Sequence, residues 1–199
     1  MTKVYPNTVV PQIPQPLSVV SATSSPLLLT VWKKSLLFNC HGFTVYDNSN
    51  GNLVYRVDNY AAGAKAEIVL MDDAGRSLLT IRRKRLSLLE NWVVYDGETT
   101  SNPRFTMTKH VNLLSSKSIA HVRITGSKTK KPVYEIEGSY TQRCCVVYDD
   151  KRHSVAEMKR KEATGGVKLG GDVFRLTVQP EIDPTVAMAL VVVLDQMFP

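Results

Sequence analysis

The strongest constraint on the fold is an apolar stretch near the end of the chain, residues 183–195. Asp183 is suited to cap a helix, and Pro184 to occupy the first helical position, where a missing amide hydrogen costs nothing. No polar residue occurs between Val186 and Leu194, so every face of this helix has to be buried. The stretch is about half the ~20 residues that a bilayer span needs. We therefore predict a short core helix, ended by Asp195 and wrapped by the rest of the fold.

The predicted core residues of this helix are Val186, Met188, Leu190, Val191, Val192, Val193 and Leu194. At ~1.5–3 kcal/mol for each large side chain, burial of the whole apolar run contributes on the order of 10–20 kcal/mol before opposing terms. This is comparable with the net stability of a domain. The helix is therefore expected to decide whether the chain folds.

The chain before this helix reads as a series of short strands. Apolar and polar residues alternate in Val133–Glu137 and Phe174–Val178, as half-buried antiparallel strands require. Asp-, Asn- and Gly-rich turns such as Asp47–Gly51 and Asp72–Gly75 separate the runs. Twelve strands are predicted: Leu28–Lys33, Phe43–Tyr46, Leu53–Val57, Glu67–Met71, Ser77–Arg82, Trp92–Tyr95, Arg104–Lys109, His121–Thr125, Val133–Ile136, Cys144–Tyr148, Val155–Arg160 and Val173–Val178.

Twelve strands exceed what one open twisted sheet usually carries, and closure into a barrel removes the exposed strand edges. The apolar helix then fills the lumen. The predicted fold is mainly β, a closed antiparallel barrel of about 12 strands around a central hydrophobic C-terminal helix. Residues 27–199 are predicted to form this single domain. Residues 1–26 contain five of the ten prolines and are predicted to form a flexible arm; a Pro-rich ligand segment is the less favoured alternative.

Composition narrows the class of protein. The net charge is +7 and the pI about 9.3, which favours an anionic partner weakly. Cys40, Cys144 and Cys145 give an odd count without disulfide spacing, and neither a secretory signal nor a lipidation motif is visible. We therefore expect an intracellular protein in the cytoplasm or at the periphery of the plasma membrane, with the nucleus as an alternative.

No enzyme motif is recognisable. The four histidines lack zinc-ligand spacing to one another or to a cysteine pair, and there is no nucleophile elbow or phosphate-binding loop before a helix. We expect no catalytic residue, metal or cofactor. In Cys144-Cys145, strand alternation should turn one thiol into the core as a small hydrophobe; a redox role is the alternative.

Basic clusters are the strongest polar feature. The candidate ligand-binding residues are Arg76, Arg82, Arg83, Lys84 and Arg85, and then Lys159, Arg160 and Lys161. On a strand, Arg82 and Lys84 would point to one side and Arg83 and Arg85 to the other. They could form a solvated rim that protects a strand edge, or a site for anionic head groups. Four such residues contribute about 4 kcal/mol near an anionic leaflet, which gives only millimolar affinity. Nucleic acid is disfavoured, because no aromatics interleave with the clusters.

A set of short motifs, in order along the chain, resembles the plant LURP-one-related family. The motifs are Gly42–Asp47 with Gly51–Leu53; Arg82, Lys84, Ser87 and Trp92; Gly138-Ser139 with Arg143–Tyr148; Ala156–Lys161; and Phe174–Val178 with Pro180 and Asp183. Together they span nearly the whole of residues 27–198.

The resemblance implies a tubby-like fold, similar to tubby C-terminal domains, which bind phosphoinositides, and to phospholipid scramblases. It also implies an association with plant defence. The function that we expect is non-enzymatic binding of acidic phospholipid head groups or of a protein partner, by a monomer, in signalling or defence. Two alternatives are a membrane-tethered, releasable transcription regulator and a purely structural interaction module.

Overall fold

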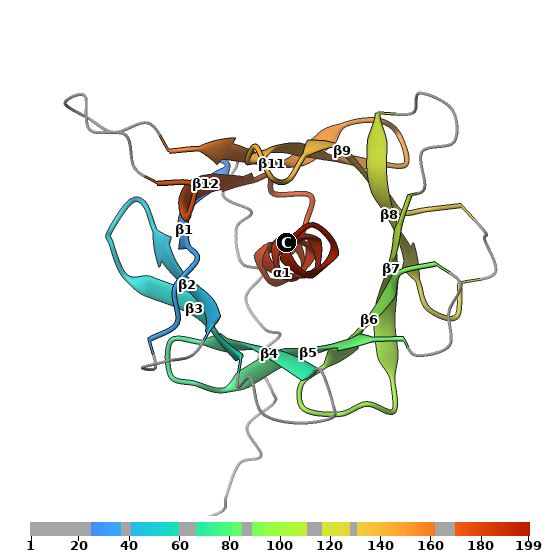
Figure 1. The fold of residues 1–199 in the computed structure, drawn as a ribbon, viewed down its shortest axis with the longest axis horizontal. Helices are drawn as coiled ribbons and strands as arrows, with labels where there is room; N and C mark the ends of the chain where they lie inside the picture. The colour runs from blue at the N-terminus through green and yellow to red at the C-terminus, as the bar shows by residue number, and fades with distance from the viewer. Residues whose placement is uncertain are drawn as a thin grey trace, which may run out of the picture.

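The structure is a computed structural model that describes residues 25–36, 41–59, 67–84, 89–110, 117–127, 131–161 and 170–199. All twelve predicted strands are present, and a single helix follows them (Figure 1). The strands are β1 (Leu27–Trp32), β2 (His41–Asp47), β3 (Leu53–Asn59), β4 (Glu67–Asp72), β5 (Ser77–Arg83), β6 (Asn91–Asp96), β7 (Pro103–Lys109), β8 (Ser118–Ile124), β9 (Tyr134–Ser139), β10 (Cys144–Asp149), β11 (Ser154–Arg160) and β12 (Val173–Val178).

The strands form a closed barrel in chain order, because β1 pairs with β12 as well as with β2. Every neighbouring pair is antiparallel, so successive strand ends alternate between the two rims of the barrel. Figure 1 shows the helix α1 (Pro184–Met197) in the centre of this ring. The predicted fold, a mainly β antiparallel barrel around a C-terminal helix, is therefore confirmed.

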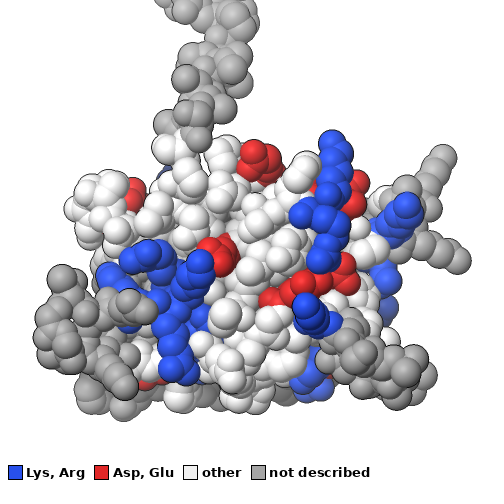
Figure 2. All heavy atoms as spheres, turned by 90° about the horizontal axis from the view of Figure 1, so that it is seen from above, with Lys and Arg blue, Asp and Glu red and all other residues white. Residues whose placement is uncertain are grey.

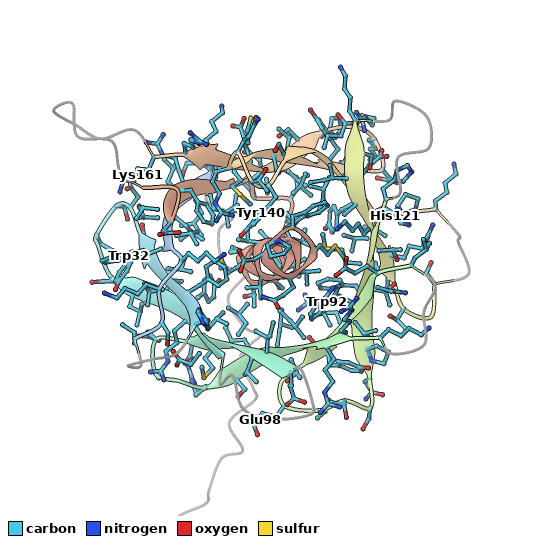
Figure 3. All side chains as sticks on the ribbon, viewed as in Figure 1. Trp32, Trp92, Glu98, His121, Tyr140 and Lys161 are labelled. Atoms are coloured by element: carbon cyan, nitrogen blue, oxygen red, sulfur yellow. The ribbon has the colours of Figure 1, made fainter. Side chains whose placement is uncertain are left out.

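The helix begins where the sequence indicates. The Asp183 side chain accepts a hydrogen bond of 2.8 Å from the Thr185 amide, and Pro184 occupies the first position. The helix continues two residues past Asp195, to Met197. The seven predicted core residues are at most 7% exposed. They pack against inward-facing strand residues such as Leu29, Leu70 and Trp92, and Figure 3 shows Trp92 directed from the wall toward α1.

Tight turns connect the strands at the rim where α1 begins. In the β2–β3 turn, the Ser49 amide donates to the Asp47 carboxylate at 2.7 Å, and Gly51 adopts a φ of 74° that side chains disfavour. This stretch is therefore a hairpin turn. The predicted arm lies outside the described residues except for positions 25 and 26, and the extent of the domain stays a prediction.

Candidate functional site

The two predicted basic clusters lie on opposite sides of the barrel. One is on β5 and the other on β11, and in the closed strand order these strands are six positions apart in either direction. They cannot surround one small ligand. Both strands nevertheless run in the same direction, so both end at the rim where α1 ends. Arg83, Lys84, Arg160 and Lys161 therefore share one rim, whereas Arg76 belongs to the other.

In the β5 cluster, two of the arginines are engaged by acids. Arg82 pairs with Glu67 on the neighbouring strand, and Arg76 Nε lies 2.7 Å from Asp72 Oδ2. Arg83 is less tightly held: its side chain is 60% exposed, and its Nη2 lies 4.0 Å from Glu90 Oε1. The strand ends at Arg83, so Lys84 follows it into the rim and is also exposed. Arg85 lies outside the described residues.

In the β11 cluster, the side chains spread over the outer wall and the rim. Lys159 pairs with Glu157 at 2.8 Å, Arg160 Nε donates to the Gln142 carbonyl at 3.0 Å, and Lys161 donates to the Thr30 hydroxyl at 3.0 Å. Figure 2 shows Lys and Arg side chains gathered on this face.

Arg175, which no local sequence pattern marks, adds to this cluster. It lies on β12 directly opposite Lys159 on β11 and opposite Thr30 on β1, and it is exposed. Two like charges side by side on neighbouring strands are unfavourable without a counter-ion. Cross-strand register, invisible in the sequence, is what brings Arg175 to the other three cations.

The rim where α1 ends is strongly basic. We define this basic rim as the described residues of 32–36, 41, 59, 67, 83–84, 89–91, 109–110, 117–118, 139–144, 160–161, 170–173 and 195–199. It carries nine cationic and four acidic side chains. The cations are Lys33, Lys34, Arg83, Lys84, Lys109, Lys117, Arg143, Arg160 and Lys161, and the acids are Glu67, Glu90, Asp172 and Asp195.

The opposite rim reverses this ratio. We define this acidic rim as the described residues of 25–27, 47–53, 72–77, 96–103, 124–127, 131–134, 149–154 and 178–184. Nine acids face four cations. The acids are Asp47, Asp72, Asp73, Asp96, Glu98, Asp149, Asp150, Glu181 and Asp183, and the cations are Arg76, Lys131, Lys151 and Arg152. The barrel is therefore polarised along the axis of its helix.

Hydrogen bonds stabilise the ionised form of carboxylates at the acidic rim. Backbone amides of Ser49 and Arg76 lower the pKa of Asp47 and Asp72, respectively. For Asp149 and Asp183, burial raises the pKa, but bonds from neighbouring amides and other donors outweigh burial and lower it. These aspartates act as turn and cap residues, and their negative charge stabilises the turns and the start of the helix.

Exposed apolar side chains also concentrate at the basic rim. Among the described residues, the large exposed hydrophobics are Trp32, Leu36, Leu89 and Ile124. The first three lie at the basic rim, and Lys34 Nζ sits 5.4 Å from the centre of the Trp32 ring. In Figure 3 the Trp32 label lies at the outside of the barrel wall. Trp side chains are enriched where proteins meet the polar boundary of a membrane.

A buried polar cluster fastens the end of α1 to the basic rim. Asp195 Oδ1 accepts from Lys33 Nζ at 2.8 Å and from the Tyr140 hydroxyl at 2.8 Å. Burial, and then the charge of Asp195, raise the pKa of Tyr140, so the phenol keeps its proton. Figure 3 shows Tyr140 between the wall and the helix. Arg143, at a φ of 53°, stacks on Tyr140 and Phe174, with its guanidinium carbon 4.3 and 4.9 Å from the ring centres.

The side chains that could carry chemistry do not converge. No group of three or more His, Cys, Asp or Glu side chains could hold a metal ion within the described ranges. Cys145 is buried, and burial raises its pKa to about 12, whereas Cys144 is exposed. Cys145 therefore occupies the core as a small hydrophobe, as the alternation predicts. Within the described part of the chain, no helix has the length and apolarity needed to cross a membrane.

Comparison with known proteins places this architecture. Residues 27–195 match the family model described as LURP-one-related. The chain is 55% identical to Protein LURP-one-related 8 of Arabidopsis thaliana over 180 residues, 88% of this chain and 89% of that protein. It is 47% identical to Protein LURP-one-related 17 of the same plant over 184 residues, 85% and 82% of the two chains. The X-ray structure of an Arabidopsis thaliana protein covers 90% of this chain and 97% of its own, with a TM-score of 0.65 and 27% identity.

Proposed function

The chain belongs to the LURP-one-related family, and on that premise we propose that it is a non-enzymatic module that docks peripherally on anionic lipid surfaces through its basic rim. The observation that carries the proposal is the coincidence of two features at one rim. Nine cations face four acids there, and Trp32, Leu36 and Leu89 are exposed among them. At the acidic rim, only Ile124 among the described residues is a large exposed hydrophobic.

The polarised charge favours one orientation on the membrane. An anionic leaflet attracts the basic rim and repels the acidic rim, so α1 should stand roughly along the membrane normal with its C-terminal end toward the lipid. The exposed Trp32 ring would then lie at head-group depth, where aromatic side chains are favoured. We expect the protein to bind the cytoplasmic leaflet, which carries most anionic lipid. The process that it would serve there is plant signalling or defence.

The two features supply different parts of the affinity. A net excess of five cations, at roughly 1 kcal/mol each, contributes about 5 kcal/mol, which alone corresponds to a Kd on the order of 0.1 mM. Partial burial of three apolar side chains adds a few kcal/mol, at ~1.5–3 kcal/mol for each side chain fully buried. Together they support micromolar binding that weakens with salt.

Vesicle sedimentation tests the proposal. The purified protein should sediment with phosphatidylcholine vesicles that contain phosphatidylserine or a phosphoinositide, and should stay in solution with phosphatidylcholine alone. Binding should decline as salt rises and persist in part at physiological ionic strength, because the apolar contribution is insensitive to screening. Absence of binding to anionic vesicles at low salt would refute the proposal. Capture of a protein by the same rim would favour the structural interaction module, and capture of duplex DNA would favour the releasable transcription regulator.

A further inference from the structure

A cavity of about 430 Å³ opens at the basic rim, between the last turn of α1 and the wall formed by β2, β3 and β4. Its size lies within the ~300–1,000 Å³ of small-molecule sites. From its lining we propose that it binds a small amphipathic anion, with one carboxylate or phosphate group at the mouth and an apolar tail inside. This inference goes beyond membrane docking, because a dissolved ligand of this kind needs no lipid surface.

The inner lining is apolar. Phe43, Val57, Ile68 and Val192 form its floor, from β2, β3, β4 and α1; each is at most 3% exposed, so only a small part of their surface is open to a ligand. An apolar tail is the group that can lie against this floor without leaving a polar atom unpaired.

Charged side chains line the mouth of the cavity. Lys33, Lys34 and His41 line it together with Asp172 and Asp195. One of the three donors of the Lys33 ammonium is taken by Asp195 at 2.8 Å, and the Lys33 side chain remains 36% exposed. Lys34 has the Trp32 ring as its neighbour, 5.4 Å from its Nζ, in place of an acid.

The rim around the mouth decides the sign of the ligand. Lys33 and Lys34 balance Asp172 and Asp195 at the mouth itself, so these four side chains alone would leave no preference. The remaining described side chains of the basic rim include seven cations and two acids. Their field raises the local concentration of anions over the opening. The buried bonds of Asp195 to Lys33 and Tyr140 hold the mouth in place.

Calorimetric titration with eight-carbon probes tests this inference without a membrane. Octanoate and octyl phosphate should bind saturably and raise Tm. Octanamide and octylammonium, with the same tail and a neutral or positive head, should bind at least about tenfold more weakly, since a charge-assisted contact is lost. Equal binding of all four probes, or no saturable binding of octanoate, would overturn the proposal.

Two variants locate the site. Gln196→Trp should obstruct the mouth from the half-buried last turn of α1 and lower octanoate affinity by about tenfold or more. Lys84→Gln, on the same rim but outside the cavity lining, removes one of the seven cations around the mouth and should lower octanoate affinity by about twofold at most. Unchanged affinity in a folded Gln196→Trp variant would contradict the assignment.

The outcome is separable from that of membrane docking. Lys84→Gln should weaken vesicle binding and change octanoate affinity little, whereas Gln196→Trp should weaken octanoate binding and leave vesicle binding undiminished. Displacement of octanoate by phosphatidylserine vesicles would identify a membrane lipid as the source of the anion. Octanoate binding without such displacement would identify a free small molecule, and either result supports the cavity.

Discussion

Lys33 and Asp195 join the end of the first strand to the end of the helix, with 2.8 Å between Nζ and Oδ1. The carboxylate is 8% exposed and lies in the last turn of α1, where the helix dipole disfavours a negative charge. Lys33 and the Tyr140 hydroxyl offset that cost. The contact therefore anchors the helix at the rim that carries the proposed function.

Lys33→Met should destabilise the fold by leaving Asp195 with only one donor. Removing one partner of a fully buried pair costs about 3–5 kcal/mol; with Lys33 36% exposed, solvent screening reduces the expected loss to about 1–2 kcal/mol. Urea unfolding measures it. Lys34→Met removes the same side chain from an exposed neighbouring position and should change the free energy of unfolding by less than half a kilocalorie. Equal effects would deny the contact its structural role.

Val192→Asp should prevent soluble folding. Val192 is fully buried in the centre of the barrel, and an isolated carboxylate cannot be accommodated there. Soluble yield and the near-ultraviolet circular dichroism spectrum report the outcome. Gln196→Asp places the same charge one turn later at a half-buried position and should remain soluble. A soluble Val192→Asp variant with wild-type Tm would contradict the role of α1 as the core.

Acid should weaken the fold through the acidic rim. The folded-state pKa of Asp183 is lowered below its ordinary 3.8: burial raises it, but the Thr185 amide and the Arg104 guanidinium outweigh burial. The stability that the ionised Asp183 contributes is therefore fully present above the unfolded-state pKa of about 3.8, and it is lost as pH falls through the lower folded-state pKa. Asp183→Asn keeps a good cap and removes the titration. Its urea midpoint should depend less steeply on pH below 4 than that of the wild type, and identical slopes would argue against this role.

The sequence was sufficient for the barrel because strand alternation and turn residues are local signals. The buried helix was equally legible, since nine successive residues leave no polar face. Asp195 was less so. A charged residue after an apolar run suggests the edge of solvent, yet its partners Lys33 and Tyr140 come from distant segments. The need for glycine at position 42 also comes from a distant segment: a Cβ there would lie 1.8 Å from the carbonyl oxygen of Val57 on the paired strand.

The candidate site depended on features that no local pattern contains. The clusters around Arg83 and Arg160 are visible in the sequence, but their placement on opposite walls and a shared rim follows from the closed strand order. Trp32 ends an apolar strand and would ordinarily be assigned to the core, whereas it is 43% exposed. Arg175 stands alone in the sequence and joins Lys159 only through cross-strand register.

The most direct test of the central proposal compares two double charge reversals in vesicle binding. Lys34→Glu with Lys84→Glu alters the basic rim, and Lys131→Glu with Lys151→Glu alters the acidic rim. All four positions are exposed, and both variants change the net charge of +7 by the same amount. At roughly 1 kcal/mol per elementary charge, the basic-rim variant should lose about a thousandfold in affinity for phosphatidylserine vesicles, while the acidic-rim variant stays near the wild type. Equal losses in the two variants would contradict docking through the basic rim.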